Sequence, residues 1–404
     1  MSEILIARQP IFDRDSTVIG YELLYRGNET DRAVFSDGNL ATSRVLSRAF
    51  MDVGVDNLIG DKLAFVNLPK EFIVGDLDLP IQESQLVLEV LEDVELDDEV
   101  IQSLELRRNE GYQLAVDDVV AVADVERALP LVHIVKIDLM SVDREKLPGE
   151  IQELKKYPVK LLAEKVETQD ELNWCRDLGF DYFQGYFLCK PTIVREKKLS
   201  SSAITIMQVL ALISSPDSEI EEVEHLVVKD VTLSFKILRL INSAAFGLNN
   251  EIKSLKQALS ILGSRKLRAL LGFMMLDQSD NKPIELMVTA TVRAKMCEEI
   301  LLRSDAPDAA SGFTVGFFSI LDALLDVPLE TLMEQLPLSL EIKDAIVHRK
   351  GRLGELLEHV IAYERGDWGN ATFDNISNDA IQECYLSALR QAAETSKLVD
   401  EQAN

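Results

Sequence analysis

The chain of 404 residues has few cysteines, no long hydrophobic run and a deficit of basic residues. No apolar run reaches the roughly 18 residues that a membrane-spanning helix requires, so membrane insertion is not expected. The N-terminus lacks the basic and long apolar regions of a signal peptide, and we therefore expect a cytoplasmic protein. No two cysteines form a Cys-x-x-Cys pair, which favours free thiols over a metal or redox site. The four cysteines are Cys175, Cys189, Cys297 and Cys384.

Basic residues are outnumbered, with 42 Lys and Arg against 69 Asp and Glu, and the net charge is −27. Such a surface repels phosphates, so a nucleic acid polymer is not an expected partner. Because acidic residues are so common in this chain, a single carboxylate does not indicate a functional site, and only carboxylates in specific sequence motifs do. The length exceeds what one core usually supports, which predicts two domains.

Residues 1 to about 195 alternate short β-rich apolar runs with stretches long enough for a helix. This alternation predicts repeated βα units around a parallel sheet. About seven such strands in fewer than 200 residues favour a compact α/β barrel of the TIM type. The clearest strand candidates are residues 63–67, 86–90, 113–117, 134–138 and 160–164.

Polar residues stand at the C-terminal ends of these strand candidates. In a barrel those ends converge on one face, where the active site lies. The residues are Asn67, Glu89, Asp117, Asp118, Lys136, Asp138 and Glu164. Oxygen ligands of this kind suit Mg²⁺ or Mn²⁺, and two such ions about 4 Å apart can promote phosphodiester cleavage. A lysine nearby can offset charge in the transition state, and the absence of His and Cys argues against zinc.

From about residue 200 the pattern changes to a 3.6-residue period with few strand signals, which predicts an all-α domain. The expected helices are residues 202–214, 233–241, 255–262 and 266–276. We assign residues 1–195 to the barrel, 196–202 to a linker containing three serines, 203–390 to the helical domain and 391–404 to a C-terminal tail.

The polar positions of the first domain occur in short motifs that resemble those of the EAL family of cyclic-di-GMP phosphodiesterases. Seven motifs stand in the family's order and cover nearly all of residues 1–195. They are Glu22-Leu23-Leu24, Asn67-Leu68, Glu89 with Glu92, Asp117-Asp118, Lys136-Ile137-Asp138, Ala163-Glu164-Lys165-Val166-Glu167-Thr168 and Gln184-Gly185-Tyr186.

The resemblance implies a role for each matching residue. Glu22, Asn67, Glu89 and Asp117 would hold a first metal ion, and Asp117 with Asp118 would hold a second. Lys136, Glu164 and Gln184 would act in catalysis by positioning the attacking water. Arg26 would contact a substrate phosphate, and Glu92 would support a loop. The implied cofactors are two Mg²⁺ or Mn²⁺ ions, and the implied reaction converts cyclic-di-GMP to linear pGpG.

Several features depart from the family pattern. Leu23 replaces the alanine of the name-giving motif, and the intervals from Glu22 to Asn67 and from Asn67 to Glu89 are short for the family. The paired aspartates are followed by Val119-Val120 instead of a segment with two glycines, and Lys165 replaces the glycine of the Ala-Glu-Gly-Val-Glu motif. Glycine permits positive φ and close backbone approach, so these changes should alter the geometry of both loops.

The second half resembles the HDOD domain, a helical relative of the HD phosphohydrolases, over residues 200–390. The resemblance rests on residues 230–247, 252–263 and 313–319. Asn242 is expected to pin a turn and Gly263 to end a helix. HD hydrolases require a His-Asp pair, and none of His133, His225, His348 and His359 precedes an aspartate. The helical domain is therefore expected to be non-catalytic.

Two interpretations stay open for the whole chain. One is a metal-dependent cyclic-di-GMP phosphodiesterase whose HDOD domain regulates it or binds other signalling proteins. The other is a catalytically weak or inactive cyclic-di-GMP receptor or scaffold. Six retained polar residues favour the enzyme, whereas the missing loop glycines favour the receptor. The six are Glu22, Asn67, Glu89, Asp117, Lys136 and Glu164. Proteins of this family often dimerise through the EAL domain, but the altered loop after Asp118 removes the basis for that inference, so whether the chain forms a homodimer stays open.

Overall fold

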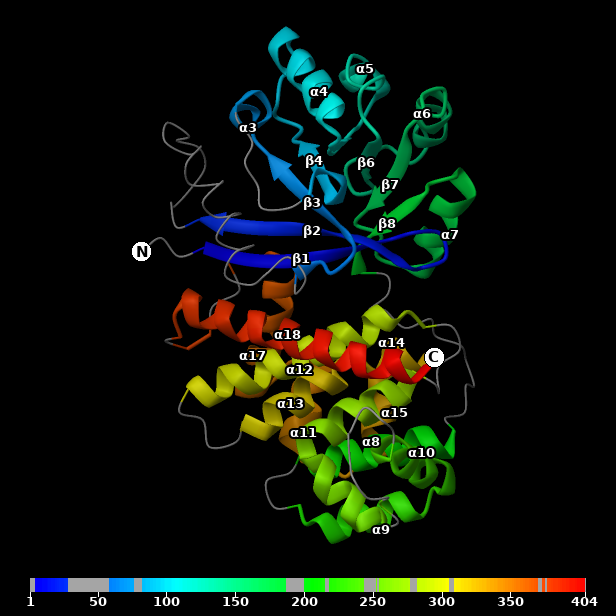
Figure 1. Cartoon of the computed structure of the whole chain (residues 1–404), viewed down its shortest axis with the longest axis vertical. Coiled ribbons are helices and arrows are strands. Elements are labelled where there is room, and N and C mark those ends of the chain that lie inside the picture. The colour runs from blue at the N-terminus through cyan, green and yellow to red at the C-terminus, as the bar shows by residue number, and fades with distance from the viewer. Residues whose placement is uncertain are drawn as a thin grey trace. The chain divides into compact units, whose positions relative to one another are not determined.

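The computed structural model describes residues 4–27, 58–75, 82–186, 200–214, 218–242, 252, 254–276, 282–304, 309–369, 373–374 and 376–403. The chain divides into two compact units, residues 1–188 with 364–366 and residues 189–363 with 367–404. Figure 1 shows strands flanked by helices in the first unit and helices in the second. Among the described residues no helix is long and apolar enough to cross a membrane.

The first unit contains a closed barrel in which the strands follow one another in chain order. They are β1 (Ile4–Phe12), β2 (Val18–Gly27), β3 (Leu63–Leu68), β4 (Leu86–Val90), β5 (Gln113–Val116), β6 (Ile134–Asp138), β7 (Lys160–Glu164) and β8 (Tyr182–Gln184). The predicted α/β barrel is thus confirmed. Strand β1 is antiparallel to both neighbours, β2 and β8, and the remaining pairs are parallel. Figure 1 shows β1 and β2 side by side as a long pair.

Helices connect the parallel strands of the barrel. They are α3 (Lys70–Val74), η1 (Glu83–Gln85, a 3-10 turn), α4 (Asp98–Glu110), α5 (Val122–Val125), α6 (Leu147–Leu154) and α7 (Gln169–Leu178). Local capping sets several of their ends. Asp97 accepts a hydrogen bond from Val100 N at the start of α4, and Thr168 forms a capping box with Glu171 at the start of α7.

The interior of the barrel explains where the polar side chains lie. One core layer consists of Ile11, Phe65, Val87, Ala115, Ile134 and Leu162. Because side chains of a strand alternate between its two faces, the residue two positions later points to the same interior. From Phe65 onward, that step leads to Asn67, Glu89, Asp117, Lys136 and Glu164. The polar cluster is therefore the next inward-facing layer, at the carboxyl ends of the strands.

The second unit is helical in its described residues, as predicted. Its helices are α8 (Ser201–Ile213), α9 (Ile220–Val228), α10 (Val231–Ile241), α11 (Leu255–Leu276), α12 (Ile284–Arg303), α13 (Ala309–Phe318), α14 (Leu321–Leu325), α15 (Leu329–Glu334), α16 (Leu340–His348), α17 (Gly351–Glu364) and α18 (Asn378–Ala403). Gly263 has non-helical backbone angles inside α11, so it separates the two predicted helices there. Phe317 and Phe318 are buried in the helical core.

The side chain of Asn242 joins the end of α10 to Ile252, whereas the expected turn falls on residues 243–251, outside the described residues. Its side-chain amide donates hydrogen bonds to the carbonyl oxygens of Leu238 at 2.9 Å and Ile252 at 2.8 Å. Its Oδ1 atom accepts from Ile252 N at 2.7 Å. The two segments that flank residues 243–251 are thereby joined through one side chain.

The structure describes only part of the predicted linker, and it places most of the predicted tail in a helix. Residues 196–199 lie outside the described residues, whereas Ser200 caps α8 by accepting a hydrogen bond from Ala203 N at 3.0 Å. Residues 391–403, assigned to a tail, instead continue α18. Buried Ala388, Leu389 and Ala392 carry the packed face of this helix across that boundary.

Candidate active site

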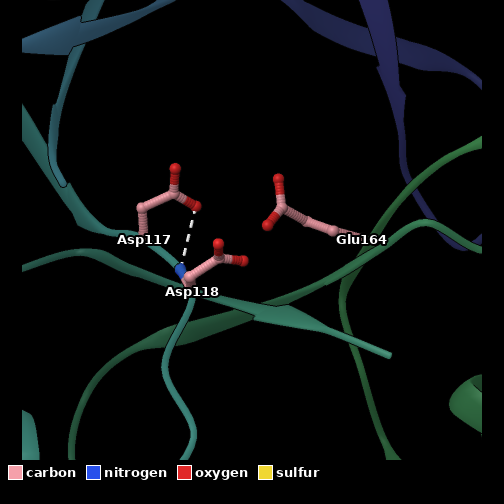
Figure 2. Close-up of side chains that lie close together, drawn as sticks. All are labelled: Asp117, Asp118 and Glu164. Carbon is pink, nitrogen blue, oxygen red and sulfur yellow. Dashed lines mark hydrogen bonds between the residues drawn. The ribbon is translucent and has the colours of Figure 1, made fainter. Parts of the chain in front are cut away.

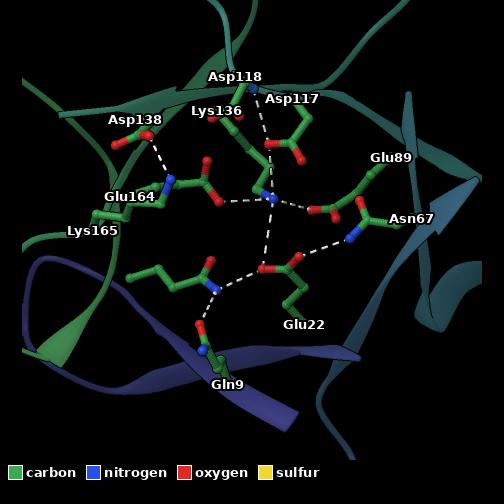
Figure 3. A network of polar contacts seen from close by, with 11 residues as sticks. Gln9, Glu22, Asn67, Glu89, Asp117, Asp118, Lys136, Asp138, Glu164 and Lys165 are labelled. Carbon is green, nitrogen blue, oxygen red and sulfur yellow. Dashed lines mark hydrogen bonds and ion pairs between the residues drawn. The ribbon is translucent and has the colours of Figure 1, made fainter. Parts of the chain in front are cut away.

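Lys136 lies at the centre of the polar layer, and its side chain has no exposed surface. Its Nζ atom is 2.9 Å from Glu89 Oε1, 3.0 Å from Asp117 Oδ1 and 2.9 Å from Glu164 Oε1. Glu22 Oε2 lies farther away, at 3.7 Å. Figure 3 shows these carboxylates converging on the ammonium group from different strands.

Glu22 is held in place by two amide side chains. Asn67 Nδ2 donates to Glu22 Oε1 at 2.9 Å, and Gln184 Nε2 donates to Glu22 Oε2 at 2.6 Å. Gln184 also donates to Gln9 Oε1 at 3.1 Å. Three amides and a carboxylate from β1, β2, β3 and β8 thus form one hydrogen-bonded chain beside Lys136 (Figure 3).

Strand register sets which polar residues become neighbours. Asn67 pairs with Glu89 across β3 and β4, and Asp138 pairs with Glu164 across β6 and β7. Asp117 and Asp118 follow β5 directly. Figure 2 shows the carboxylates of Asp117, Asp118 and Glu164 close together, and one oxygen atom from each lies within 4.8 Å of the other two.

Burial and crowding shift the ionisation of this cluster. Burial raises the pKa of Glu89 well above its ordinary value, although the positive charge of Lys136 opposes the shift. Burial likewise raises the pKa of Glu164 to about 8. For Lys136, burial alone would lower the pKa, but the negative charges of Glu22 and Glu89 outweigh it and the pKa is raised. Such coupled shifts are typical of functional sites.

The donor set fits divalent cations that prefer oxygen ligands. Four carboxylates lie within 4 Å of the Lys136 ammonium group, and that of Asp118 lies close to those of Asp117 and Glu164. Five carboxylates and one lysine give a formal charge of about −4, which two divalent cations would neutralise. Glu89 Oε2 is buried and accepts no hydrogen bond from the described residues. The carboxylates are Glu22, Glu89, Asp117, Asp118 and Glu164.

Of the predicted site residues, Arg26 and Glu92 differ from the rest. The side chain of Arg26 lies outside the described residues. Glu92 is exposed in the turn after β4. Burial raises the pKa of Asp118, and the negative charges of Asp117 and Glu92 add to that shift.

The structure adds Gln9 and Lys165 to the predicted set and shows which residue pairs with Asp138. Gln9 was not predicted because Arg8-Gln9-Pro10 gives its strand a mixed polar pattern without a clear apolar run. Asp138 is 2% exposed, and its Oδ2 atom lies 2.5 Å from Lys165 Nζ. Its place at the end of a strand candidate was visible in the sequence, but its partner was not.

Comparison with known proteins agrees with this architecture. The sequence model of the EAL domain matches residues 67–191, and that of the HDOD domain matches residues 199–319. Cyclic di-GMP phosphodiesterase CdgJ of Vibrio cholerae is 35% identical over 370 residues, which cover 90% of this chain and 85% of that protein. Uncharacterized protein YuxH of Bacillus subtilis is 30% identical over 397 residues, which cover 96% and 97%.

A solved structure also matches part of the chain. The Bacillus subtilis YkuI protein, with an EAL domain and in complex with cyclic-di-GMP and calcium, is 22% identical with a TM-score of 0.38. The match covers 64% of this chain and 71% of that chain.

The barrel with its carboxylate–amide–lysine cluster, joined to an all-helical unit, defines a two-domain protein of the EAL and HDOD type. The chain belongs to the family of EAL–HDOD proteins, to which the relative from Vibrio cholerae ties it over most of both lengths. Glu22 lies outside the matched EAL range, yet its carboxylate joins the cluster through Asn67 and Gln184.

Proposed function

We propose that this chain is a metal-dependent phosphodiesterase that hydrolyses cyclic-di-GMP to linear pGpG. The observation that carries the proposal is the position of Lys136, whose ammonium group lies within 3.0 Å of carboxylates from three different strands or strand ends. The relative from Vibrio cholerae, which is named a cyclic di-GMP phosphodiesterase, supports the choice of substrate.

The oxygen-rich cluster is proposed to hold two Mg²⁺ or Mn²⁺ ions. Glu22, Asn67, Glu89 and Asp117 would bind the first ion, and Asp117 with Asp118 would bind the second. When bound, such ions supply Lewis-acid charge for the attack of water on a phosphodiester. The buried, unbonded Glu89 Oε2 atom supports this assignment, since a buried carboxylate oxygen without a partner is costly.

The remaining roles belong to side chains that touch this cluster. Lys136 would hold the attacking water and offset negative charge as it develops. Glu164, whose pKa burial raises to about 8 before any cation binds, would help to position the attacking water. Gln184 would keep the carboxylate of Glu22 oriented through their 2.6 Å hydrogen bond. Arg26 would contact a substrate phosphate, and Glu92 would support the adjoining loop.

A second candidate function is a cyclic-di-GMP receptor that binds without turnover. The loop after β5 favours it, because Asp118 has a left-handed backbone with φ of 48° and no glycine follows. Val119 is buried, and its N–H donates to Lys136 O at 3.0 Å, which ties the loop to β6. A loop held in this way adjusts less readily to a metal ion.

Calorimetric titration with cyclic-di-GMP separates these two functions. Nucleotide binding that requires Mn²⁺ supports the enzyme, because the metal site must then be assembled first. Binding of equal strength with a chelator present supports the receptor. No binding under either condition contradicts both.

We infer that the helical unit regulates the barrel or binds other signalling proteins. The lack of a His-Asp pair supports a non-catalytic role. His359 of this unit lies edge-on to Phe373, a contact that suits packing. Sedimentation of the full chain would measure whether it forms a homodimer.

Turnover is tested by incubating the full chain with cyclic-di-GMP and Mg²⁺ or Mn²⁺ and following linear product by chromatography. We expect product with the unaltered chain and none with Glu22→Ala or Lys136→Ala. Lys160→Ala is the matched control, because it removes a lysine from the opposite end of the barrel and should keep activity. Turnover that survives in Lys136→Ala would contradict the proposed site.

A further inference from the structure

Lys165 occupies a backbone conformation that side-chain-bearing residues rarely adopt. It follows β7 directly, and its φ is 53°, in the left-handed region where glycine is favoured. The left-handed conformation costs a residue with a Cβ atom roughly 1 kcal/mol. A lysine at such a position therefore needs a compensating interaction.

The compensating interaction is an ion pair with a fixed acid. Lys165 Nζ lies 2.5 Å from Asp138 Oδ2, and Asp138 is almost completely buried. Asp138 also accepts hydrogen bonds from Met140 N and Ser141 Oγ, each at 2.8 Å. Because these bonds hold Asp138 rigidly, they also fix where the ammonium group of Lys165 stands.

This ammonium group lies beside the acidic cluster, as Figure 3 shows. Lys165 adjoins Glu164 in the chain, and its partner Asp138 pairs with Glu164 across β6 and β7. The positive charge of Lys165 opposes the rise that burial and Asp117 cause in the pKa of Asp118. A cation at this edge thus acts on two of the three carboxylates that gather at Asp117, Asp118 and Glu164.

We propose that Lys165 is a built-in counter-ion that weakens divalent-cation binding at Asp117, Asp118 and Glu164. This inference rests on the proposed metal site, and it adds that Lys165 limits the affinity of that site for cations. A fixed positive charge repels an incoming cation and already neutralises part of the carboxylate charge. The second metal ion then binds only at elevated concentration, so the supply of Mg²⁺ or Mn²⁺ would decide when the site is complete.

The test is calorimetric titration of the full chain with Mn²⁺ alone, without nucleotide. Lys165→Met removes the charge and keeps the length of the side chain, whereas Lys165→Arg keeps the charge. Lys160→Met is the matched control at the other end of β7: Lys160 is 58% exposed against 60% for Lys165, and it pairs with Asp181 at 2.8 Å. Both neutral variants change the net charge of the protein equally.

We expect Lys165→Met to tighten the weaker Mn²⁺ site roughly tenfold at low salt, with a smaller effect at high salt. Lys165→Arg and Lys160→Met should stay within about twofold of the unaltered chain. Equal affinities for all variants, or a change that salt does not reduce, would overturn the role of Lys165 and leave the metal site standing. Absence of Mn²⁺ binding in every variant would overturn the metal site itself.

Discussion

Lys136 Nζ lies 2.9 Å from Glu89 Oε1, and neither side chain has any exposed surface. The pair joins β6 to β4 through the interior of the barrel. Taking two charges out of water costs several kcal/mol per ion, so the pair persists only because further carboxylates surround the lysine. This arrangement connects the stability of the barrel to the chemistry of the site.

Replacing Lys136 tests that connection. In Lys136→Met we expect the free energy of unfolding in chelator to fall by about 3 kcal/mol, because buried carboxylates lose their counter-ion. Added Mn²⁺ should restore more stability to this variant than to the unaltered chain, since a cation replaces the lost charge. Urea unfolding with and without Mn²⁺ measures both effects. A variant as stable as the unaltered chain in chelator would contradict the interior ion pairs.

The pKa of Glu164 predicts a pH dependence. Burial raises it from an ordinary value of 4.5 to about 8, so the metal-free folded state binds this proton more tightly than the unfolded chain. The stabilisation is complete below pH 4.5 and is lost as pH rises through about 8. We expect Glu164→Gln to flatten the decline in metal-free stability between pH 5 and pH 9, as thermal unfolding in chelator would record. An unchanged slope would count against the shift.

Metal binding should release protons for the same reason. Ligand carboxylates must be ionised, so apparent Mn²⁺ affinity should rise between pH 6 and pH 8 and then level off. Calorimetry in buffers of different ionisation enthalpy counts the protons released. We expect Mn²⁺ binding to release fewer protons from Glu164→Gln than from the unaltered chain. An equal number would show that the released proton comes from a residue other than Glu164.

Gly20 tests how closely β2 approaches β3 below the site. A Cβ atom there would lie 2.8 Å from Leu63 O and 2.8 Å from a ring carbon of Phe65. We expect Gly20→Ala to destabilise the chain by about 2 kcal/mol and to weaken Mn²⁺ binding, because Glu22 is only two residues away. Thermal unfolding and Mn²⁺ titration provide the measurements.

Gly149 is the matched control for that change. Gly149 is in the first turn of α6, and within the described part of the chain no heavy atom beyond its own helix backbone lies within 4 Å of a Cβ placed there. Gly149→Ala should be neutral or stabilising by up to about 1 kcal/mol, with unchanged Mn²⁺ binding. Equal effects of the two substitutions would argue against close strand packing at Gly20.

Substitutions at Asn242 test whether the stability of the helical unit is independent of metal binding in the barrel. Asn242→Ala removes three hydrogen bonds to Leu238 and Ile252, and should lower the free energy of unfolding by about 2 kcal/mol. Asn242→Asp keeps the acceptor for Ile252 N and should lose less. Urea unfolding followed by circular dichroism measures the loss. Mn²⁺ affinity should be unchanged in both variants, and a shift in that affinity would contradict independent sites.

Much of the architecture could be predicted because it is local in origin. Short apolar runs at regular intervals indicate parallel strands, and a period of 3.6 residues indicates the helices that follow. Strand β1 escaped prediction because its polar residues, Arg8 and Gln9, interrupt the apolar pattern. The continuation of α18 through Ala403 was also missed, since its apolar face extends beyond the residues taken to close the domain.

The sequence by itself determined which side chains enter the barrel's upper layer. A strand repeats every two residues, so Phe65 and Leu162 in the core place Asn67 and Glu164 in the site. Only the tertiary structure decided the contacts among them. Barrel closure joins Gln184 of β8 to Glu22 of β2, residues 162 positions apart, and strand register places Asp138 where Lys165 can pair with it. Alternation along a strand is a local property, whereas the distance between two charges depends on how all the strands close.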